Sequence, residues 1–266
     1  MQPMTGAEPQ EPILLQSLED GVLHLTLNRP QQFNALSEDM LTALTGAMRE
    51  CAHRPQVRVV VLSAKGKAFC AGHDLKQMRE RHGQDYYTAL FARCSECMRS
   101  IVELPRPVIA RVHGLATAAG CQLVATCDLA VASESAEFAV SGINLGLFCS
   151  TPSVALSRNV LPKRAFEMLM TGEFINAATA VEYGLVNRAV PEAQLDGAID
   201  TLTHTIKRKP PVAVETGKRL FYRQAEMSLG EAYRLAGKTM ACNMMAEDTV
   251  EGVDAFIAKR SPKWNH

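Results

Sequence analysis

The segment Arg111-Val-His-Gly-Leu-Ala-Thr-Ala-Ala-Gly-Cys-Gln-Leu-Val-Ala-Thr-Cys-Asp128 decides the fold of this chain. The apolar run Pro107–Val112 predicts a strand, and the run Leu123–Cys127 predicts a helix. Between them lie small residues, which let backbone N–H groups approach a ligand closely, while the start of the helix adds positive potential. These small residues are Gly114, Ala116, Ala118, Ala119 and Gly120. The segment therefore predicts a site for an anion, or for a carbonyl oxygen that becomes negative during a reaction.

A second segment, Gly66-Lys-Ala-Phe-Cys-Ala-Gly-His-Asp-Leu-Lys76, also turns at small residues after a predicted strand, Val57–Leu62. Together the two segments resemble the paired oxyanion-hole loops of the crotonase (enoyl-CoA hydratase/isomerase) superfamily. The resemblance extends over nearly the whole chain, from Asn28-Arg-Pro-Gln-Gln-Phe-Asn-Ala-Leu36 to Phe256-Ile-Ala-Lys-Arg-Ser-Pro-Lys-Trp264. Within the superfamily, the chain looks most like the enoyl-CoA hydratase domain-containing proteins that lack the catalytic glutamates.

Composition is that of an ordinary globular protein, with 47% hydrophobic and 21% charged residues. Lys+Arg and Asp+Glu both total 28, so no overall field attracts nucleic acid or an anionic membrane. No apolar run reaches the ~18–20 residues that a membrane span requires. Residues 1–12 are polar and proline-containing, and we expect them to form a disordered lead. A cytoplasmic location follows, or the mitochondrial matrix if an organellar presequence has been removed.

The eight cysteines are scattered through apolar segments, which predicts reduced, buried thiols. Cys94-x-x-Cys97 falls inside a helical pattern without a second Cys or His pair at zinc spacing. We therefore expect core thiols and no metal site.

Strand and helix patterns alternate through the first part of the chain. Val22–Leu27 alternates as a strand, Ser37 precedes a helix as its N-cap, and Thr151 and Pro152 are expected to begin another helix with Pro at its first position. Repeated strand–turn–helix units indicate an α/β fold. After about residue 195 only helical periodicity remains, in four segments. These segments are Ala198–Lys207, Pro211–Gln224, Leu229–Met245 and Glu247–Lys259.

The resemblance implies a more specific architecture. Residues 13–197 would form a crotonase-like spiral of ββα units that binds acyl-CoA. Residues 198–266 would form a C-terminal all-helical trimerisation region, giving a homotrimer or a hexamer built as a dimer of trimers. A tail that packs only on its own core is the alternative.

The resemblance also assigns the oxyanion-hole donors to the backbone N–H groups of His73 and Ala119. The His73 side chain would contact coenzyme A or stabilise its loop, and no partner for acid–base work is visible in the sequence. Ala118, Gly120 and Cys149 would line the acyl pocket. A nucleophilic Cys149 would need a neighbouring base or activation by a helix end.

Coenzyme A carries phosphates, so basic residues should surround its entrance. The positions that the resemblance places around the cofactor portion are Arg29, Phe33, Ala35, Leu36, Ala71, His73, Asp74, Leu75, Lys76, Phe256 and Lys259. Phe256 and Lys259 would reach the ligand of a neighbouring subunit. Asp74 is also expected to cap a helix, and His113 to pack or hydrogen-bond behind the loop.

The chain departs from the family where hydratases carry two glutamates that position and polarise water. Those two positions hold Gln122 and Gly142, and a third position, aspartate in some relatives, holds Ser150. General acid–base assistance contributes ~10²–10⁴-fold per group, so hydration of a 2-enoyl-CoA should be weak or lost. Another crotonase reaction (isomerisation, decarboxylation or thioester hydrolysis) and a non-catalytic acyl-CoA binder both remain open. No tightly bound cofactor is expected; a coenzyme A thioester is the substrate or ligand.

Overall fold

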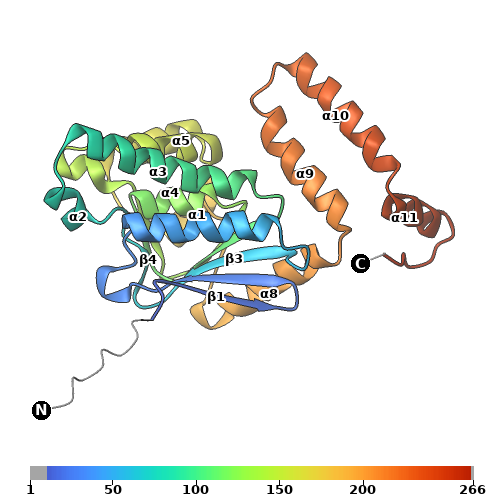
Figure 1. Ribbon diagram of the computed structural model, residues 1–266, viewed down its shortest axis with the longest axis horizontal. Coiled ribbons are helices and arrows are strands. Elements are labelled where there is room, and N and C mark those ends of the chain that lie inside the picture. Colours follow the sequence, from blue (N-terminus) through green and yellow to red (C-terminus); the bar gives the residue numbers. More distant parts are fainter. Residues whose placement is uncertain (1–10, 265–266) are drawn as a thin grey trace, which may run out of the picture.

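Two sheets form the framework of the protein. The computed structural model describes residues 11–264, and Figure 1 shows the sheets surrounded by helices. The first sheet has the order β1-β2-β3-β5-β7-β10 and the second the order β4-β6-β8-β9. Strand bounds in the first sheet are β1 Leu14–Glu19, β2 Val22–Leu27, β3 Val59–Ala64, β5 Val108–Val112, β7 Leu129–Ser133 and β10 Arg188–Val190. Those in the second are β4 Ala68–Cys70, β6 Leu115–Thr117, β8 Glu137–Ala139 and β9 Ile175–Asn176.

The chain alternates between the two sheets before entering a helix. Thus β3 and β4 are followed by α2 and α3, β5 and β6 by α4, and β7 and β8 by η2 and α5. Body helices are α1 Glu38–Ala52, α2 Leu75–Glu80, α3 Gln84–Glu103, α4 Ala119–Thr126, α5 Ser150–Asn159, α6 Pro162–Thr171, α7 Ala177–Tyr183 and α8 Leu195–Lys207. Short 3₁₀ turns are η1 Pro30–Gln32, η2 Ser141–Leu145 and η3 Glu192–Gln194. This confirms the predicted α/β spiral of ββα units.

The central strands of the first sheet are apolar on both faces, as buried parallel strands require. One face of the sheet packs into the main core, to which α1, α3 and α4 contribute. The other face is covered by α8, whose Leu195 and Ile199 pack against valines of β2, β3 and β7. The boundary expected at residue 198 falls inside α8, a helix that packs against the first sheet.

Three helices follow α8 as an arm: α9 Pro211–Gln224, α10 Leu229–Met244 and α11 Glu247–Ile257. In Figure 1 the arm runs alongside the body in orange and red, with α10 and α11 on its far side. Large apolar side chains stay exposed on it, among them Met245 at 81% and Phe256 at 83%. An exposed apolar surface of this kind indicates a contact with another molecule.

Several local expectations can be compared with the structure. Ser37 caps α1 by accepting from the Met40 N–H, as expected. The helix expected to start at Thr151 begins at Ser150, so Pro152 is its third residue and not its first. Proline is tolerated there because N–H groups in a first turn have no partner within the helix. The expected disordered lead falls, apart from residues 11 and 12, outside the described residues.

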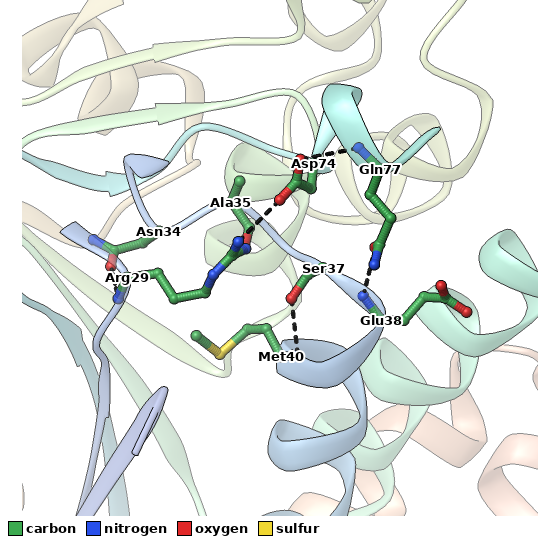
Figure 2. A network of polar contacts seen from close by, with 8 residues as sticks. All are labelled: Arg29, Asn34, Ala35, Ser37, Glu38, Met40, Asp74 and Gln77. Carbon is green, nitrogen blue, oxygen red and sulfur yellow. Dashed lines mark hydrogen bonds and ion pairs between the residues drawn. The ribbon is translucent and has the colours of Figure 1, made fainter. Parts of the chain in front are cut away.

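Asn34 ties the loop before α1 to the start of β4. Its backbone is left-handed, with φ of 54°, a conformation that Asn tolerates. The side chain is fully buried, accepts from the Arg29 N–H at 2.9 Å, and donates to the carbonyls of Lys65 and Ala68 at 2.8 Å each. Figure 2 shows Asn34 beside Arg29 in this loop.

Removing these bonds should destabilise the protein. We expect Asn34→Gly, which keeps the left-handed backbone accessible, to lower the free energy of unfolding by roughly 2–4 kcal/mol, because three buried backbone groups lose their partner. Urea unfolding followed by circular dichroism measures the change. Asn28→Gly, at a half-buried asparagine whose side chain bonds to Glu11 and to the Pro12 carbonyl, is the control. Equal stability losses in the two variants would contradict the account.

Candidate functional site

Three segments leave the same edge of the second sheet. β4 and β6 pair in parallel, and so do β6 and β8. The carboxyl ends of parallel strands lie at one edge, and there β4 leads to the His73 loop, β6 to α4, and β8 to η2. The predicted loop, the predicted helix start and the Gly142 position are thereby brought together from three distant parts of the sequence.

The first two segments touch through backbone. Gly72 has φ of +95°, and a Cβ built there would lie 2.9 Å from the Ala118 Cβ and 3.3 Å from the Ala119 nitrogen. Any side chain at residue 72 would force the loops apart. Glycine is therefore required here for both its conformation and its lack of volume.

Two backbone N–H groups at this contact have no acceptor within residues 11–264. Leu36 forms a parallel bridge beside His73 by donating to the Gly72 carbonyl at 2.7 Å and accepting from the Asp74 N–H at 3.4 Å. That bridge leaves the His73 N–H without a partner among the described residues. Ala119 is the first residue of α4, where an N–H has no partner within the helix and carries positive potential.

Gln122 lies one turn further along α4, on the same side as Ala119. Only 3% of the residue is exposed, and its Oε1 has no hydrogen-bond partner among the described residues. A buried amide oxygen without a partner is costly, and a ligand or water that donates to it would remove the cost. The amide cannot ionise, so it can orient a ligand or a water but cannot act as a strong base.

The second lost-glutamate position is closed. A Cβ at Gly142 would lie 2.7 Å from the Cys149 Sγ and 2.7 Å from the Leu147 carbonyl oxygen. The thiol therefore occupies the space that a side chain at residue 142 would enter. At the third position, Ser150 turns its hydroxyl to the Phe148 carbonyl at 3.3 Å.

Cys149 is a buried thiol, only 6% exposed, at the N-cap of α5. Burial raises the pKa of this thiol more than a hydrogen bond from the Gly142 backbone lowers it. The neutral form is favoured, which argues against a nucleophilic Cys149. The expected core thiols Cys94 and Cys97 are likewise buried in α3.

The His73 side chain turns away from solvent toward α3. Its ring meets that of Phe91 edge-on, with centroids 5.5 Å apart. Both ring nitrogens are buried, and neither has a partner among the described residues. Burial lowers the pKa of His73, and the Leu36 backbone opposes this only in part. The imidazole is therefore neutral near pH 7, and Phe91 is a contact that sequence reasoning missed.

Arg29 and Asp74 form an ion pair at 3.0 Å at the entrance of the loop, with both side chains mostly buried. Arg29 also donates to the Ala35 carbonyl at 2.8 Å, and Asp74 accepts from the Gln77 N–H, which confirms its role as a helix cap. Figure 2 shows this connected set. Burial raises the pKa of Asp74, but its bonds to Arg29 and Gln77 outweigh burial, so the pKa is lowered.

The other residues expected around coenzyme A divide by exposure. Phe33, Leu75 and Lys76 are exposed at the surface, and Ala71 is half-buried. Ala35 and Leu36 are buried, so they offer little side-chain surface. Phe256 lies exposed on α11, and Lys259 follows that helix with φ of 52°.

Three further residues, Ala118, Gly120 and His113, lie close to the two loops. Ala118 lies half-buried at the loop contact, as a lining residue should. A Cβ at Gly120, by contrast, would overlap the Cys70 carbonyl, so this glycine packs α4 against β4. His113 hydrogen-bonds through Nε2 to the Gly66 carbonyl at 2.8 Å, behind the loop as expected.

Comparisons with known proteins identify the family of this chain. The chain matches the model for the family described as enoyl-CoA hydratase/isomerase over residues 17–266. It belongs to that family. The expected resemblance to the superfamily is thereby confirmed.

Similar proteins are alike over almost their full length. The mitochondrial enoyl-CoA hydratase domain-containing protein 3 of Rattus norvegicus is 44% identical over 98% of this chain and 87% of its own. A crystal structure of enoyl-CoA hydratase from Mycobacterium smegmatis is 61% identical, with a TM-score of 0.95, over 96% of this chain and 100% of that one. The human domain-containing protein 3 structure has 44% identity and a TM-score of 0.92, over 95% and 100%.

Two kinds of feature are absent from residues 11–264. No helix there combines the length and apolar character needed to cross a membrane. Nor do three or more His, Cys, Asp or Glu side chains gather there in a group that could hold a metal ion.

The closed Gly142 position predicts a steric effect on stability. Gly142→Ala should lower the free energy of unfolding by about 1–3 kcal/mol, because the new methyl group overlaps the Cys149 sulfur and the Leu147 carbonyl. Gly142→Ala combined with Cys149→Ala should cost less than the sum of the single changes, measured by denaturant unfolding. Gly46→Ala, on α1 with nothing within 4 Å, is the control and should stabilise slightly. Strictly additive losses would contradict the contact.

The buried imidazole predicts a pH dependence of stability. The unfolded chain takes up a proton on His73 below about pH 6.5, whereas the folded chain resists it, because burial lowers the folded-state pKa. The free energy of unfolding should therefore fall as pH drops from 7.5 to 5.5, and His73→Phe should remove part of that fall. Parallel slopes in wild type and His73→Phe would disprove the burial effect.

Proposed function

We propose that this protein binds acyl-CoA thioesters, with the thioester carbonyl oxygen accepting hydrogen bonds from the backbone N–H groups of His73 and Ala119. The supporting observation is the backbone contact at Gly72, which brings the His73 loop against the first residue of α4. Two unpaired N–H groups on either side of one contact suit a single oxygen atom. The positive end of α4 favours negative charge on that oxygen.

Fixed donors of this kind stabilise the charge that develops on the carbonyl oxygen when an enolate or a tetrahedral species forms. Each donor is typically worth ~3–4 kcal/mol in the transition state. The donors are backbone groups, so the side chains of His73 and Ala119 do not change this role. The oxyanion hole formed by these two N–H groups is therefore sufficient, in this proposal, to bind the thioester and to polarise its carbonyl group.

Hydration of a 2-enoyl-CoA, the activity for which the family is named, is weak or lost in this proposal. Water addition needs groups that activate water and deliver a proton, and Gln122 can orient water but is a poor base. Gly142 supplies no side chain, and Cys149 fills its space. The closure favours the second candidate, a non-catalytic acyl-CoA binder, over a crotonase reaction that needs a carboxylate at residue 142.

The coenzyme A portion would lie along the exposed surface near Phe33, Leu75 and Lys76. Arg29 already pairs with Asp74, so its part in this proposal is to hold the loop rather than to bind phosphate. Lys76, which is exposed, is the better candidate for a phosphate contact. Cys149 and Ala118 would line the acyl end. In this proposal the protein holds no tightly bound cofactor, and the coenzyme A thioester is its ligand.

The arm would mediate assembly into a homotrimer or a dimer of trimers, as the resemblance implies. Its exposed apolar side chains, such as Met245 and Phe256, are the supporting observation. Phe256 and Lys259 would then lie near the ligand of a neighbouring subunit. The rat relative is named as mitochondrial; for this chain the cytoplasm or the mitochondrial matrix stays a prediction.

Binding and hydration can be measured separately. Calorimetry should show saturable binding of crotonyl-CoA, while loss of the conjugated-thioester absorbance should be far slower than ordinary enzyme turnover of ~1–10³ s⁻¹. Gln122→Glu should raise hydration above wild type, whereas Gly142→Glu alone should not, because Cys149 blocks the new side chain. Gln194→Glu, in the 3₁₀ turn η3 outside the site, is the control. Absence of binding to any acyl-CoA would refute the proposal, and fast hydration by wild type would refute the lost-glutamate account.

Assembly is tested by sedimentation equilibrium. The 29.0 kDa chain should give a mass of three or six chains, because the apolar surface of the arm needs a partner. Met245→Asp together with Phe256→Asp should weaken the assembly, since charge would enter the buried contact. Phe33→Asp, which changes an exposed apolar residue of the body, should not. A wild-type monomer at micromolar concentration would contradict the proposed role of the arm.

A further inference from the structure

A buried lysine of the arm forms several hydrogen bonds with the body. Lys218 of α9 is almost fully buried, and its Nζ donates three hydrogen bonds to the body. The acceptors are the carbonyls of Ile101 at 2.8 Å and Arg106 at 3.0 Å, and the Asp128 carboxylate at 2.6 Å. The three donors of the ammonium group are thus fully used.

Two of the three acceptors lie at the carboxyl end of a helix that leads to the site. Ile101 is in the last turn of α3, where carbonyls have no partner within the helix, and a cation is favourable there. Asp128 follows α4 directly, after its C-cap residue Cys127. Phe91, within α3, contacts the His73 ring. Ala119 is the first residue of α4. Lys218 therefore bonds at the carboxyl ends of α3 and α4, two of the helices that contribute residues to the candidate site.

Asp128 is the centre of this junction. Besides Lys218, its carboxylate accepts from the Tyr222 hydroxyl of α9 at 2.8 Å and from the Val108 N–H, at the start of β5, at 2.6 Å. α9 also forms an ion pair between Glu215 and Arg106. A buried charged pair with all its hydrogen-bonding groups satisfied is rigid, and loss of one member is costly. Movement of α9 is therefore coupled to the end of α4.

We propose that Lys218 is a positioning residue for the acyl-CoA site, which fixes α3 and α4 from their carboxyl ends and so couples the arm to the oxyanion hole. This inference rests on the proposed function. α4 has eight residues, a rigid rod of about 12 Å, so a shift at Asp128 is passed to Ala119. Placement of the arm, by assembly or otherwise, then sets how well the Ala119 N–H meets the thioester oxygen.

The experiment measures the preference of the site for a thioester carbonyl. For each variant, calorimetry gives the Kd of butyryl-CoA and of butyl-CoA, a thioether that lacks the carbonyl; their ratio reports on the oxyanion hole and not on coenzyme A contacts. The main variant is Lys218→Met with Asp128→Asn, which removes both charges together. Tyr222→Phe is a milder variant of the same junction. Lys207→Met with Asp20→Asn is the control, since Lys207 of α8 forms an ion pair with Asp20 at 2.5 Å, and its Nζ bonds to Asp20 alone among the described residues.

We expect the double variant to lose carbonyl preference by about 3- to 10-fold, Tyr222→Phe to lose less, and the control to keep the wild-type ratio. Sedimentation at the same concentration should show the wild-type mass. A folded double variant with an unchanged ratio, an equal loss in the control, or a loss that appears only with dissociation would overturn the positioning role. If the double variant does not fold, Tyr222→Phe decides in the same way. A wild type without any carbonyl preference would instead refute the proposed oxyanion hole, whatever Lys218 does.

Discussion

The rest of the site depends on the contact between the backbone at Gly72 and the backbone at Ala118 and Ala119. A single added carbon at Gly72 would lie 3.3 Å from the Ala119 nitrogen, so the loops approach as closely as backbone allows. The Leu36 bridge fixes the first loop at Gly72 and Asp74, and the side-chain bonds of Asn34 and Arg29 fix the chain on either side of it. Because these bonds use neighbouring groups, the His73 N–H has no acceptor in the described part of the chain, and one unpaired donor lies on each side of the contact.

Several polar side chains around that contact carry no charge. They include an amide at Gln122, a neutral thiol at Cys149 and a neutral imidazole at His73. Burial disfavours the charged form of the last two, and the amide has none. A site of this composition can hold and polarise a carbonyl but offers no strong base. The buried charges nearby, Arg29 with Asp74 and Lys218 with Asp128, are paired with each other and hold elements in place.

Much of the fold could be predicted from the sequence, and the misses have physical causes. Residues 22–27 alternate between apolar and polar side chains, and residues 108–112 are mostly apolar. The predicted bounds of these two strands agree closely with the structure. β4, β6 and β9 have only two or three residues, too few for any period to be seen. The helix α8 was assigned to the C-terminal region because its periodicity equals that of the arm; only the packing of Leu195 and Ile199 on the sheet distinguishes it.

In the candidate site, too, some features could be predicted from the sequence and others could not. Positions fixed by backbone, such as Gly72 and the start of α4, could be found because glycine and alanine mark them. The closing of Gly142 by Cys149 and the contact of His73 with Phe91 depend on side chains from distant segments, which one sequence does not relate. The Lys218 junction was not predicted either, since an isolated lysine in a helical pattern resembles any solvated lysine until its three acceptors are seen.

The most direct test of the account is a crystal structure of the protein with a bound acyl-CoA thioester. The account predicts a carbonyl oxygen about 2.7–3.1 Å from both the His73 and Ala119 nitrogens, with Gln122 as the nearest polar side chain to the acyl carbons. A thioester oxygen bound elsewhere, or a carboxylate within hydrogen-bonding distance of the acyl Cα or Cβ, would contradict it.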